Sequence, residues 1–136
     1  MYDIAINYWA VLVAAIAAMV IGYLWYSMGV FGRMWMEGIG KTEEQIKAGY
    51  KPTSMLWTYL LAALMAYVLA HFISLVGADT ISEALTVAWW AWLGFVAATF
   101  ATNAIYEGRS GKLFWINSLY QLVNLLVMAA IIVSWR

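Results

Sequence analysis

The side chains that could do chemistry in this chain are a few polar groups set within long apolar stretches of its C-terminal half. Residues three or four apart share one face of a helix, and by this spacing two adjoining segments each present a polar face. If the chain turns back near Ser110, Asn103 lies level with Asn117. Thr99 then lies level with Gln121, so two complementary amide ladders meet across the hairpin. The polar residues of the two faces are Thr99, Asn103, Glu107, Asn117, Gln121 and Asn124.

Two interpretations of these faces remain open. Hydrogen bonds between membrane helices contribute about 1 kcal/mol each, so the amides could serve only to hold the helices together. Alternatively, they line a polar track in which Glu107, the carboxylate beside these faces, is a proton or cation site. Glu107 also lies close to Arg109 and Lys112, which favours a simple ion pair. His71, on another predicted helix, either extends the track towards the opposite end or is a hydrogen-bonded structural residue.

The residues needed for the commoner enzyme mechanisms do not come together in this sequence. A catalytic zinc site takes about three protein ligands, whereas the chain has one His and no Cys. Asp79 and Ser82 flank one predicted turn, but no nucleophile motif surrounds a serine. The glycines within 38–40 and 108–111 are typical of turns and form no phosphate-binding loop. We therefore expect no enzyme activity, no metal site and no cofactor.

Four apolar segments must position these side chains. The hydrophobic fraction of 66% exceeds the roughly 45–50% of soluble domains, and a bilayer core takes about 20 apolar residues to cross as a helix. The pattern predicts an all-α, polytopic membrane protein, a single domain over residues 1–136, with its helices in an up-down antiparallel bundle. The four transmembrane helices are expected at about 5–27, 55–76, 82–107 and 113–135.

The basic residues indicate how the chain is oriented. Six of the seven Lys and Arg fall in the first and third connections, and Arg136 alone lies on the other side. Because cytoplasmic loops are enriched in Lys and Arg, we expect a cell (inner) membrane protein with connections 28–54 and 108–112 in the cytoplasm and both termini outside. The net charge of zero gives no electrostatic case for binding nucleic acid.

The long connection 28–54 is predicted to hold a short amphipathic helix in the membrane interface. Within residues 31–37 the apolar side chains fall on one side and the charged ones on another. A second helix begins at Thr42 with a capping-box pattern, and Glu43 and Lys47 on it are spaced for an ion pair. At the predicted cytoplasmic end a largely aromatic cluster either anchors the chain in the interface or lines a contact surface, and it consists of Trp25, Tyr26, Ser27, Phe31 and Trp35.

Small residues recur every four positions on the first two predicted membrane helices. Helices associate in lipid through close packing, and small side chains let their backbones approach. These two stripes therefore predict tight helix–helix contacts, either within one chain or between copies in a homo-oligomer. The stripes are formed by Ala10, Ala14, Ala18 and Gly22, and by Ala62, Ala66, Ala70 and Ser74.

A series of short motifs, in order along the chain, resembles one family of membrane proteins. The motifs are Gly22-Tyr23-Leu24-Trp25-Tyr26-Ser27, Phe31-Gly32, Trp35-Met36, Thr42-Glu43-Glu44, Met65-Ala66-Tyr67-Val68-Leu69-Ala70, Gly94-Phe95-Val96-Ala97-Ala98-Thr99, Asn103, Glu107-Gly108-Arg109, Ile116-Asn117 and Tyr120. By them the chain is similar to the domain of unknown function 1761 family along almost its whole length, although Met28 stands where that family often has proline. The resemblance implies a four-helix integral membrane protein with no assigned activity. By analogy it makes the following the preferred site residues: Trp25, Tyr26, Ser27, Phe31, Gly32, Trp35, Thr99, Asn103, Glu107 and Asn117.

These observations favour a non-enzymatic membrane protein that binds or transports a small polar or amphipathic solute through the polar track. Its expected partners are the lipid bilayer, further copies of the same chain and the solute itself. The alternative is a structural or accessory membrane subunit whose polar residues only stabilise helix packing. A weaker alternative is a lipid-binding or lipid-modifying activity at the cytoplasmic interface.

Overall fold

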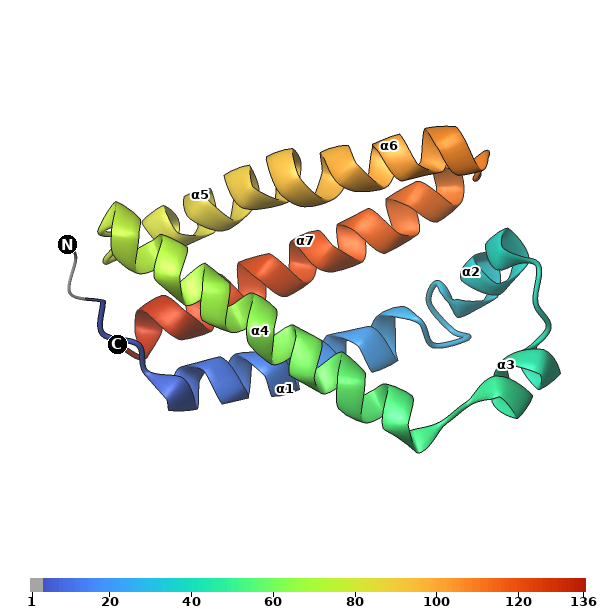
Figure 1. Cartoon of the computed structure of the whole chain (residues 1–136), viewed down its shortest axis with the longest axis horizontal. Coiled ribbons are helices and arrows are strands. Elements are labelled where there is room, and N and C mark those ends of the chain that lie inside the picture. The colour runs from blue at the N-terminus through green and yellow to red at the C-terminus, as the bar shows by residue number, and fades with distance from the viewer. Residues whose placement is uncertain (1–3) are drawn as a thin grey trace.

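Four long helices account for most of the chain in a computed structural model, which describes residues 4–136 (Figure 1). Each is long enough and apolar enough to span a membrane, as predicted, and the bounds agree with the expected ones within a few residues. The third span is one continuous helix whose middle is π-helical, so three labels cover it. The spans are α1 (Tyr8–Trp25), α4 (Pro52–Val76), α5, η1 and α6 (Ile81–Ala91, Trp92–Ala97 and Ala98–Glu107) and α7 (Gly111–Ser134).

Local capping explains where these helices begin and end. The side chain of Asn7 accepts hydrogen bonds from two amides in the first turn of α1, and the side chain of Ser110 caps α7 in the same way. Pro52 opens α4 at a position where a helix has no use for its missing N–H. Gly77 and Gly108 end α4 and α6 in the left-handed conformation that favours glycine.

The fourth span, α7, is the helix around which the others gather. It packs against α1, α4 and α5, and α1 also packs along α4. In Figure 1 the chain direction alternates from span to span, so α1 begins where α7 ends. We call this end the terminal end, and we call the opposite end, where the α1–α4 and α6–α7 connections lie, the loop end.

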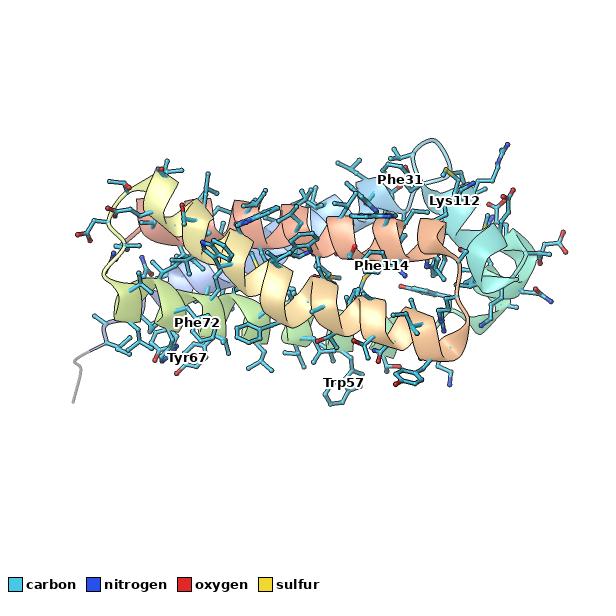
Figure 2. The ribbon with its side chains drawn as sticks, turned by 90° about the horizontal axis from the view of Figure 1, so that it is seen from above. Phe31, Trp57, Tyr67, Phe72, Lys112 and Phe114 are labelled. Atoms are coloured by element: carbon cyan, nitrogen blue, oxygen red, sulfur yellow. The ribbon has the colours of Figure 1, made fainter. Side chains whose placement is uncertain are left out.

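The second span, α4, separates from the rest of the bundle towards the loop end. Figure 1 shows it crossing the bundle at an angle and diverging from α6. Its residues 52–58 are all exposed. In Figure 2, Trp57 projects from α4 away from the rest of the bundle. The first turns of α4 therefore make little contact with the other spans.

The small-residue stripes lie inside this one chain. A methyl group added at Gly22 would come within 2.7 Å of the Tyr120 hydroxyl on α7, so the two helices approach closely there. The stripes therefore take part in close contacts within the chain. Their alanines are covered by other helices of the same chain. The alanines buried in this way are Ala10, Ala14, Ala18, Ala62, Ala66 and Ala70.

The connection between α1 and α4 holds two short helices, α2 (Gly32–Ile39) and α3 (Glu43–Gly49). The predicted capping box is confirmed, because the Thr42 hydroxyl accepts from the Gln45 amide at 3.2 Å. The Gln45 side chain accepts in return from the Thr42 amide at 2.9 Å. The predicted ion pair on α3 also forms, at 3.2 Å. Of the two helices, α2 packs against α7, so the connection is fixed to the bundle there.

The third span departs from expectation at Trp92–Ala97, which form a π-helix. A π-helical turn takes up an extra residue and so re-aims the side chains that follow it. Trp92 is 4% exposed, and its Nε1 donates to the backbone carbonyl of Ser118 on α7 at 2.6 Å. Trp89 and Trp90 remain exposed. Of these three tryptophans, Trp92 is therefore the one that packs in the interior.

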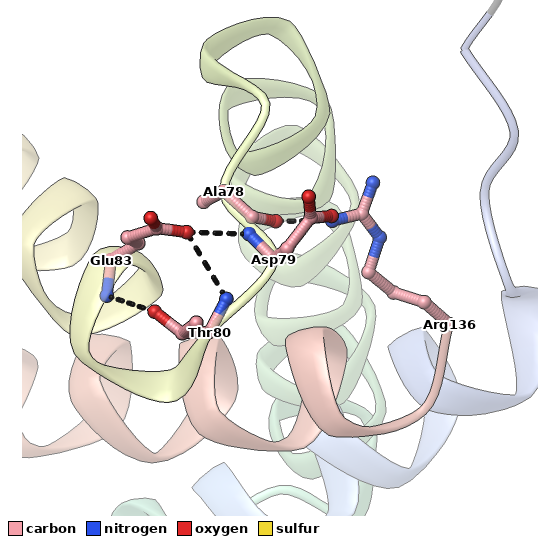
Figure 3. A network of polar contacts seen from close by, with 5 residues as sticks. All are labelled: Ala78, Asp79, Thr80, Glu83 and Arg136. Atoms are coloured by element: carbon pink, nitrogen blue, oxygen red, sulfur yellow. Dashed lines mark hydrogen bonds and ion pairs between the residues drawn. The ribbon is translucent and has the colours of Figure 1, made fainter.

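A polar network closes the terminal end (Figure 3). Arg136 donates to the backbone carbonyl of Ala78 and, at 3.0 Å, to the Asp79 carboxylate. Glu83 accepts from the amides of Asp79 and Thr80 at 2.8 and 3.2 Å. The Thr80 hydroxyl accepts in turn from the Glu83 amide, which completes a capping box at the start of α5. The network ties the end of α7 to the turn between α4 and α5.

Candidate functional site

Hydrogen bonds from aromatic side chains hold the polar face of α7 in place at the loop end. The Tyr26 hydroxyl donates to Asn117 Oδ1 at 2.7 Å. Trp25 Nε1 donates to the backbone carbonyl of Ile116 at 3.0 Å. From the other side, the Tyr120 hydroxyl donates to a backbone carbonyl of α1 at 3.2 Å. These bonds fix the last turns of α1 against the first half of α7.

The other members of the predicted aromatic cluster pack around these hydrogen bonds. The ring centroid of Phe31 lies 4.7 Å from that of Trp25, and the centroid of Trp35 lies 5.5 Å from that of Tyr26. These separations are typical of favourable aromatic pairs. Ser27 instead donates to a carbonyl of α1 at 2.7 Å. The structure therefore brings the four aromatic residues together, with Ser27 beside them.

A cavity of about 180 Å³ adjoins this cluster, between α6 and α7. Asn117 belongs to both, because its Oδ1 accepts from Tyr26 while the residue also lines the cavity. Figure 2 shows Phe114 beside α6 and α7 at the loop end. The other residues that line the cavity are Phe100, Asn103, Ala104, Glu107, Arg109 and Leu113.

The charged groups of the cavity pair with each other. Arg109 Nε donates to Glu107 Oε2 at 2.6 Å, and both side chains are about half exposed. An ion pair with this exposure contributes about 1 kcal/mol or less to stability. Within residues 4–136 the two terminal nitrogens of Arg109 have no hydrogen-bond partner, nor has the amide of Asn103. The cavity therefore presents uncommitted donors and acceptors.

Further along α7, three buried oxygens have no hydrogen-bond partner among the described residues. They are Ser118 Oγ, Gln121 Oε1 and Asn124 Oδ1. Ser118 is fully buried and Asn124 is 3% exposed. Leaving a buried polar atom unpaired costs about 1–3 kcal/mol. Polar groups kept at that cost inside an apolar bundle are candidates for function.

The predicted amide ladders across the α6–α7 hairpin do not form. Thr99 is exposed, and its hydroxyl donates to the carbonyl of Phe95 in its own helix at 2.7 Å. Asn117 bonds to Tyr26 and not to Asn103. The reason is that α5 packs extensively against α7 whereas α6 does so only slightly. The hairpin is therefore open at the level where the ladders were expected.

His71 lies apart from this site. Its Nδ1 is 2.9 Å from the backbone carbonyl of Tyr67, and its ring centroid is 4.5 Å from that of Tyr67. Tyr67 stacks in turn on Tyr8 of α1, at 6.2 Å. The half of α7 towards the terminal end buries apolar residues, Met128 and Ala129 among them. The polar groups on α7 therefore do not run on to His71.

Phe100 and Phe114 form aromatic walls of the cavity, and the sequence did not single them out because only polar residues were considered as candidates. Phe100 precedes Asn103 by three positions and Phe114 precedes Asn117 by three, so each shares a helical face with a predicted site residue. That spacing was the signal that could have found them. Arg109 was expected only as an ion-pair partner of Glu107, and it proves to line the cavity as well.

The lining determines what the cavity can hold. Asn103 and Glu107 offer hydrogen-bond acceptors, while Arg109 and Asn117 offer donors, all within apolar walls. Such a lining suits a small ligand that carries both donors and acceptors. Across residues 4–136 no three His, Cys, Asp or Glu side chains gather as metal ligands would.

Comparison with known proteins gives a family but no individual relative. No curated protein and no solved structure matches the chain. A family model described as protein of unknown function (DUF1761) matches residues 9–133, which is nearly the whole chain and confirms the resemblance seen in the motifs. The chain therefore belongs to the DUF1761 family of proteins of unknown function.

Proposed function

We propose that this protein is a multi-pass membrane protein that binds a small polar or amphipathic solute in the cavity between α6 and α7, without a catalytic step. The observation that carries the proposal is the lining of that cavity, where unpaired groups of Asn103 and Arg109 face a site walled by aromatic rings. Polar groups held within a membrane helix bundle are costly and usually functional. The bond from Tyr26 holds Asn117 in one orientation, which lowers the cost of ordering it when a ligand binds.

The proposal includes a placement in the membrane. The spans form an up-down antiparallel bundle in the cell's inner membrane, with the loop end in the cytoplasm, because the loop connections carry six Lys and Arg. Helix α2 lies in the headgroup layer as an amphipathic helix, and Trp35 on it packs against Tyr26 at the end of α1. The cavity then opens close to the cytoplasmic interface.

Transport of the solute across the bilayer would be a second step. The buried polar groups of α7 end at Asn124, and the next turns bury apolar residues such as Met128 and Ile132. A polar solute that reached this level would lose its hydrogen bonds to water without gaining others. We therefore propose binding at the loop end as the basic function, with any passage requiring α4 or α6 to move relative to α7.

Native mass spectrometry of the protein released from mild detergent tests the proposal. We expect the wild type to carry a small-molecule adduct that Asn103→Leu loses, because Asn103 lines the cavity and the substitution breaks no described hydrogen bond. Thr102→Val is the matched control, since the Thr102 hydroxyl bonds to a carbonyl of its own helix. A wild type without an adduct, or an adduct retained equally by Asn103→Leu, would overturn the proposal.

One other observation favours a second candidate, a structural or accessory subunit. The first turns of α4 are largely exposed, and Trp57 there is 64% exposed. A helix segment with so few contacts could dock a partner helix or a second copy of the chain, whereas the alanine stripes are already covered. In the same spectra, a chain attached to another protein or to its own copy, with no small adduct, would favour this role over solute binding.

A further inference from the structure

A second cavity lies about midway along the length of the bundle, on the side where α4 adjoins the third span. It has a volume of about 340 Å³ and is bounded by α4, by η1 with the end of α5, and by α7. Every residue that lines it is apolar, including Val68 and Phe72 of α4, Phe95 and Val96 of η1, and Leu125 of α7. Its chemistry is therefore that of a hydrocarbon site.

Two rows of side chains connect this apolar cavity with the polar one. On the third span, Val96 lines the apolar cavity and Phe100, four residues later, lines the polar cavity. On α7, Leu125 lines the apolar cavity and Asn117, two turns away, lines the polar one, with Gln121 between them. On α7, which is α-helical throughout, side chains four residues apart lie on one helical face. The two cavities therefore adjoin the same face of α7, and we take them as the two parts of one groove.

The groove is open sideways at its polar part. Helix α4 walls the apolar cavity but contributes no residue to the polar cavity. Figure 1 shows why, because α4 diverges from α6 towards the loop end. A molecule could therefore enter laterally from the surrounding membrane without passing through the bundle.

The dimensions match those of one lipid chain and its headgroup. From Val96 to Glu107 the helix rises about 16 Å at about 1.5 Å per residue, and one leaflet of a bilayer core is about 15 Å thick. The polar cavity, of about 180 Å³, is smaller than the apolar cavity of about 340 Å³. It suits the headgroup of an amphipathic ligand, whose acyl chain would then lie along the groove.

The charges at the polar end indicate which headgroup fits. The Glu107 carboxylate and the Asn103 amide oxygen can accept from an ammonium group, which has N–H donors to give. The terminal nitrogens of Arg109, which its bond to Glu107 leaves uncommitted, match a phosphate. Asn117 adds a donor, because Tyr26 occupies its oxygen and leaves the amide nitrogen for a ligand.

We propose that this groove binds a membrane phospholipid with a zwitterionic headgroup, a primary ammonium next to a phosphate, as in phosphatidylethanolamine. The ammonium lies against Glu107 and Asn103, the phosphate against Arg109 and Asn117, and one acyl chain runs along the groove to the apolar cavity. This inference rests on the proposed function and names the ligand class of the same site. Phosphatidylcholine has no N–H donor for the carboxylate, and phosphatidylglycerol has no cation, so both should bind less well.

Lipid competition tests the headgroup. The purified full chain is equilibrated with equal amounts of phosphatidylethanolamine, phosphatidylcholine and phosphatidylglycerol of the same acyl chains, and bound lipids are counted by native mass spectrometry. We expect the wild type to retain phosphatidylethanolamine preferentially. In the Glu107→Gln variant, the preference for phosphatidylethanolamine over phosphatidylglycerol should fall about fivefold, which corresponds to about 1 kcal/mol. Arg109→Gln should lower retention of all three lipids, and Glu44→Gln on the exposed helix α3 is the matched control.

A second pair of variants tests the acyl-chain part of the groove. Val68→Trp fills the apolar cavity and should lower retention of every lipid. Leu61→Trp introduces the same side chain at an exposed position of the same helix outside that cavity, and it should leave retention unchanged.

Each outcome of these experiments supports or overturns the proposed lipid binding. Equal retention of the three lipids by the wild type overturns the inference, and this result needs no variant to fold. An unchanged preference in Glu107→Gln, or full lipid retention in Val68→Trp, also overturns it. If a non-lipid adduct depends on Asn103 while lipid retention ignores Glu107, the proposed function stands and the lipid inference fails. If neither kind of ligand binds, both fail.

Discussion

Replacing Gly22 by alanine tests how closely α1 and α7 approach each other. The added methyl would lie 2.7 Å from the Tyr120 hydroxyl oxygen and 3.3 Å from the ring carbon that bears it. Since α1 is fixed by its packing on α4, the Tyr120 ring has to move. Its hydrogen bond to the carbonyl of Ala18, 3.2 Å long, is then lost.

The expected result is a clear loss of stability. Forcing a methyl group into a packed interior costs about 1–3 kcal/mol, and losing one hydrogen bond costs about 1 kcal/mol more. The better helix propensity of alanine offsets about 1 kcal/mol. We therefore expect Gly22→Ala to lower the free energy of unfolding by about 1–3 kcal/mol.

Unfolding by SDS from mixed micelles, followed by far-ultraviolet circular dichroism, measures this change. Gly94→Ala is the matched control within a membrane span, because no atom lies within 4 Å of a methyl there. Tyr120→Phe removes the hydroxyl that meets the new methyl, so the double variant should be more stable than the two single losses predict together. A Gly22→Ala protein as stable as Gly94→Ala, or losses that simply add, would refute the close approach.

Three further changes have definite expected results. Trp92→Phe removes a buried indole donor to α7 and should lower the free energy of unfolding by about 1–2 kcal/mol, whereas Trp89→Phe, at a 43% exposed ring, should cost less than about 0.5 kcal/mol. Equal losses in SDS unfolding would contradict the packing described for Trp92. Arg136→Ala should cost less than about 1 kcal/mol, and the loss should shrink at high salt, because the Asp79 carboxylate is 83% exposed. In this cysteine-free chain, a cysteine at Lys47 should resist an impermeant thiol reagent in intact cells while one at Asp79 reacts, and the reverse would contradict the proposed orientation.

The elements of the fold were predictable because their signals are local. Runs of about 20 apolar residues mark each span whatever its neighbours are, and the capping box at Thr42 depends on four consecutive residues. The alanine stripes predicted close contacts but not the partner. Spacing defines the face of a helix, whereas the partner of Ala14 or Ala66 depends on how α1 and α4 cross.

The candidate site was predictable only in part. Asn103, Glu107 and Asn117 do line one cavity, as their shared faces indicated. The prediction of amide ladders assumed that the two helices of the hairpin pack against each other along their whole length, whereas α6 makes only slight contact with α7. The bond between Tyr26 and Asn117 joins residues 91 positions apart, and no local pattern encodes such a pairing.

The π-helical segment changes the rotation of the second half of the third span, about the helix axis, relative to its first half. Trp92 fixes the half towards the terminal end against α7, while Asn103 and Glu107 follow the extra residue. One residue turns an α-helix by about 100°, so deleting one residue from 92–97 would restore α-helical winding and swing the polar wall of the cavity away from α7. Such a deletion would leave every side chain of the site unchanged in type. The direction in which this site faces is therefore controlled by the length of the chain, and a single insertion or deletion could redirect it where no substitution could.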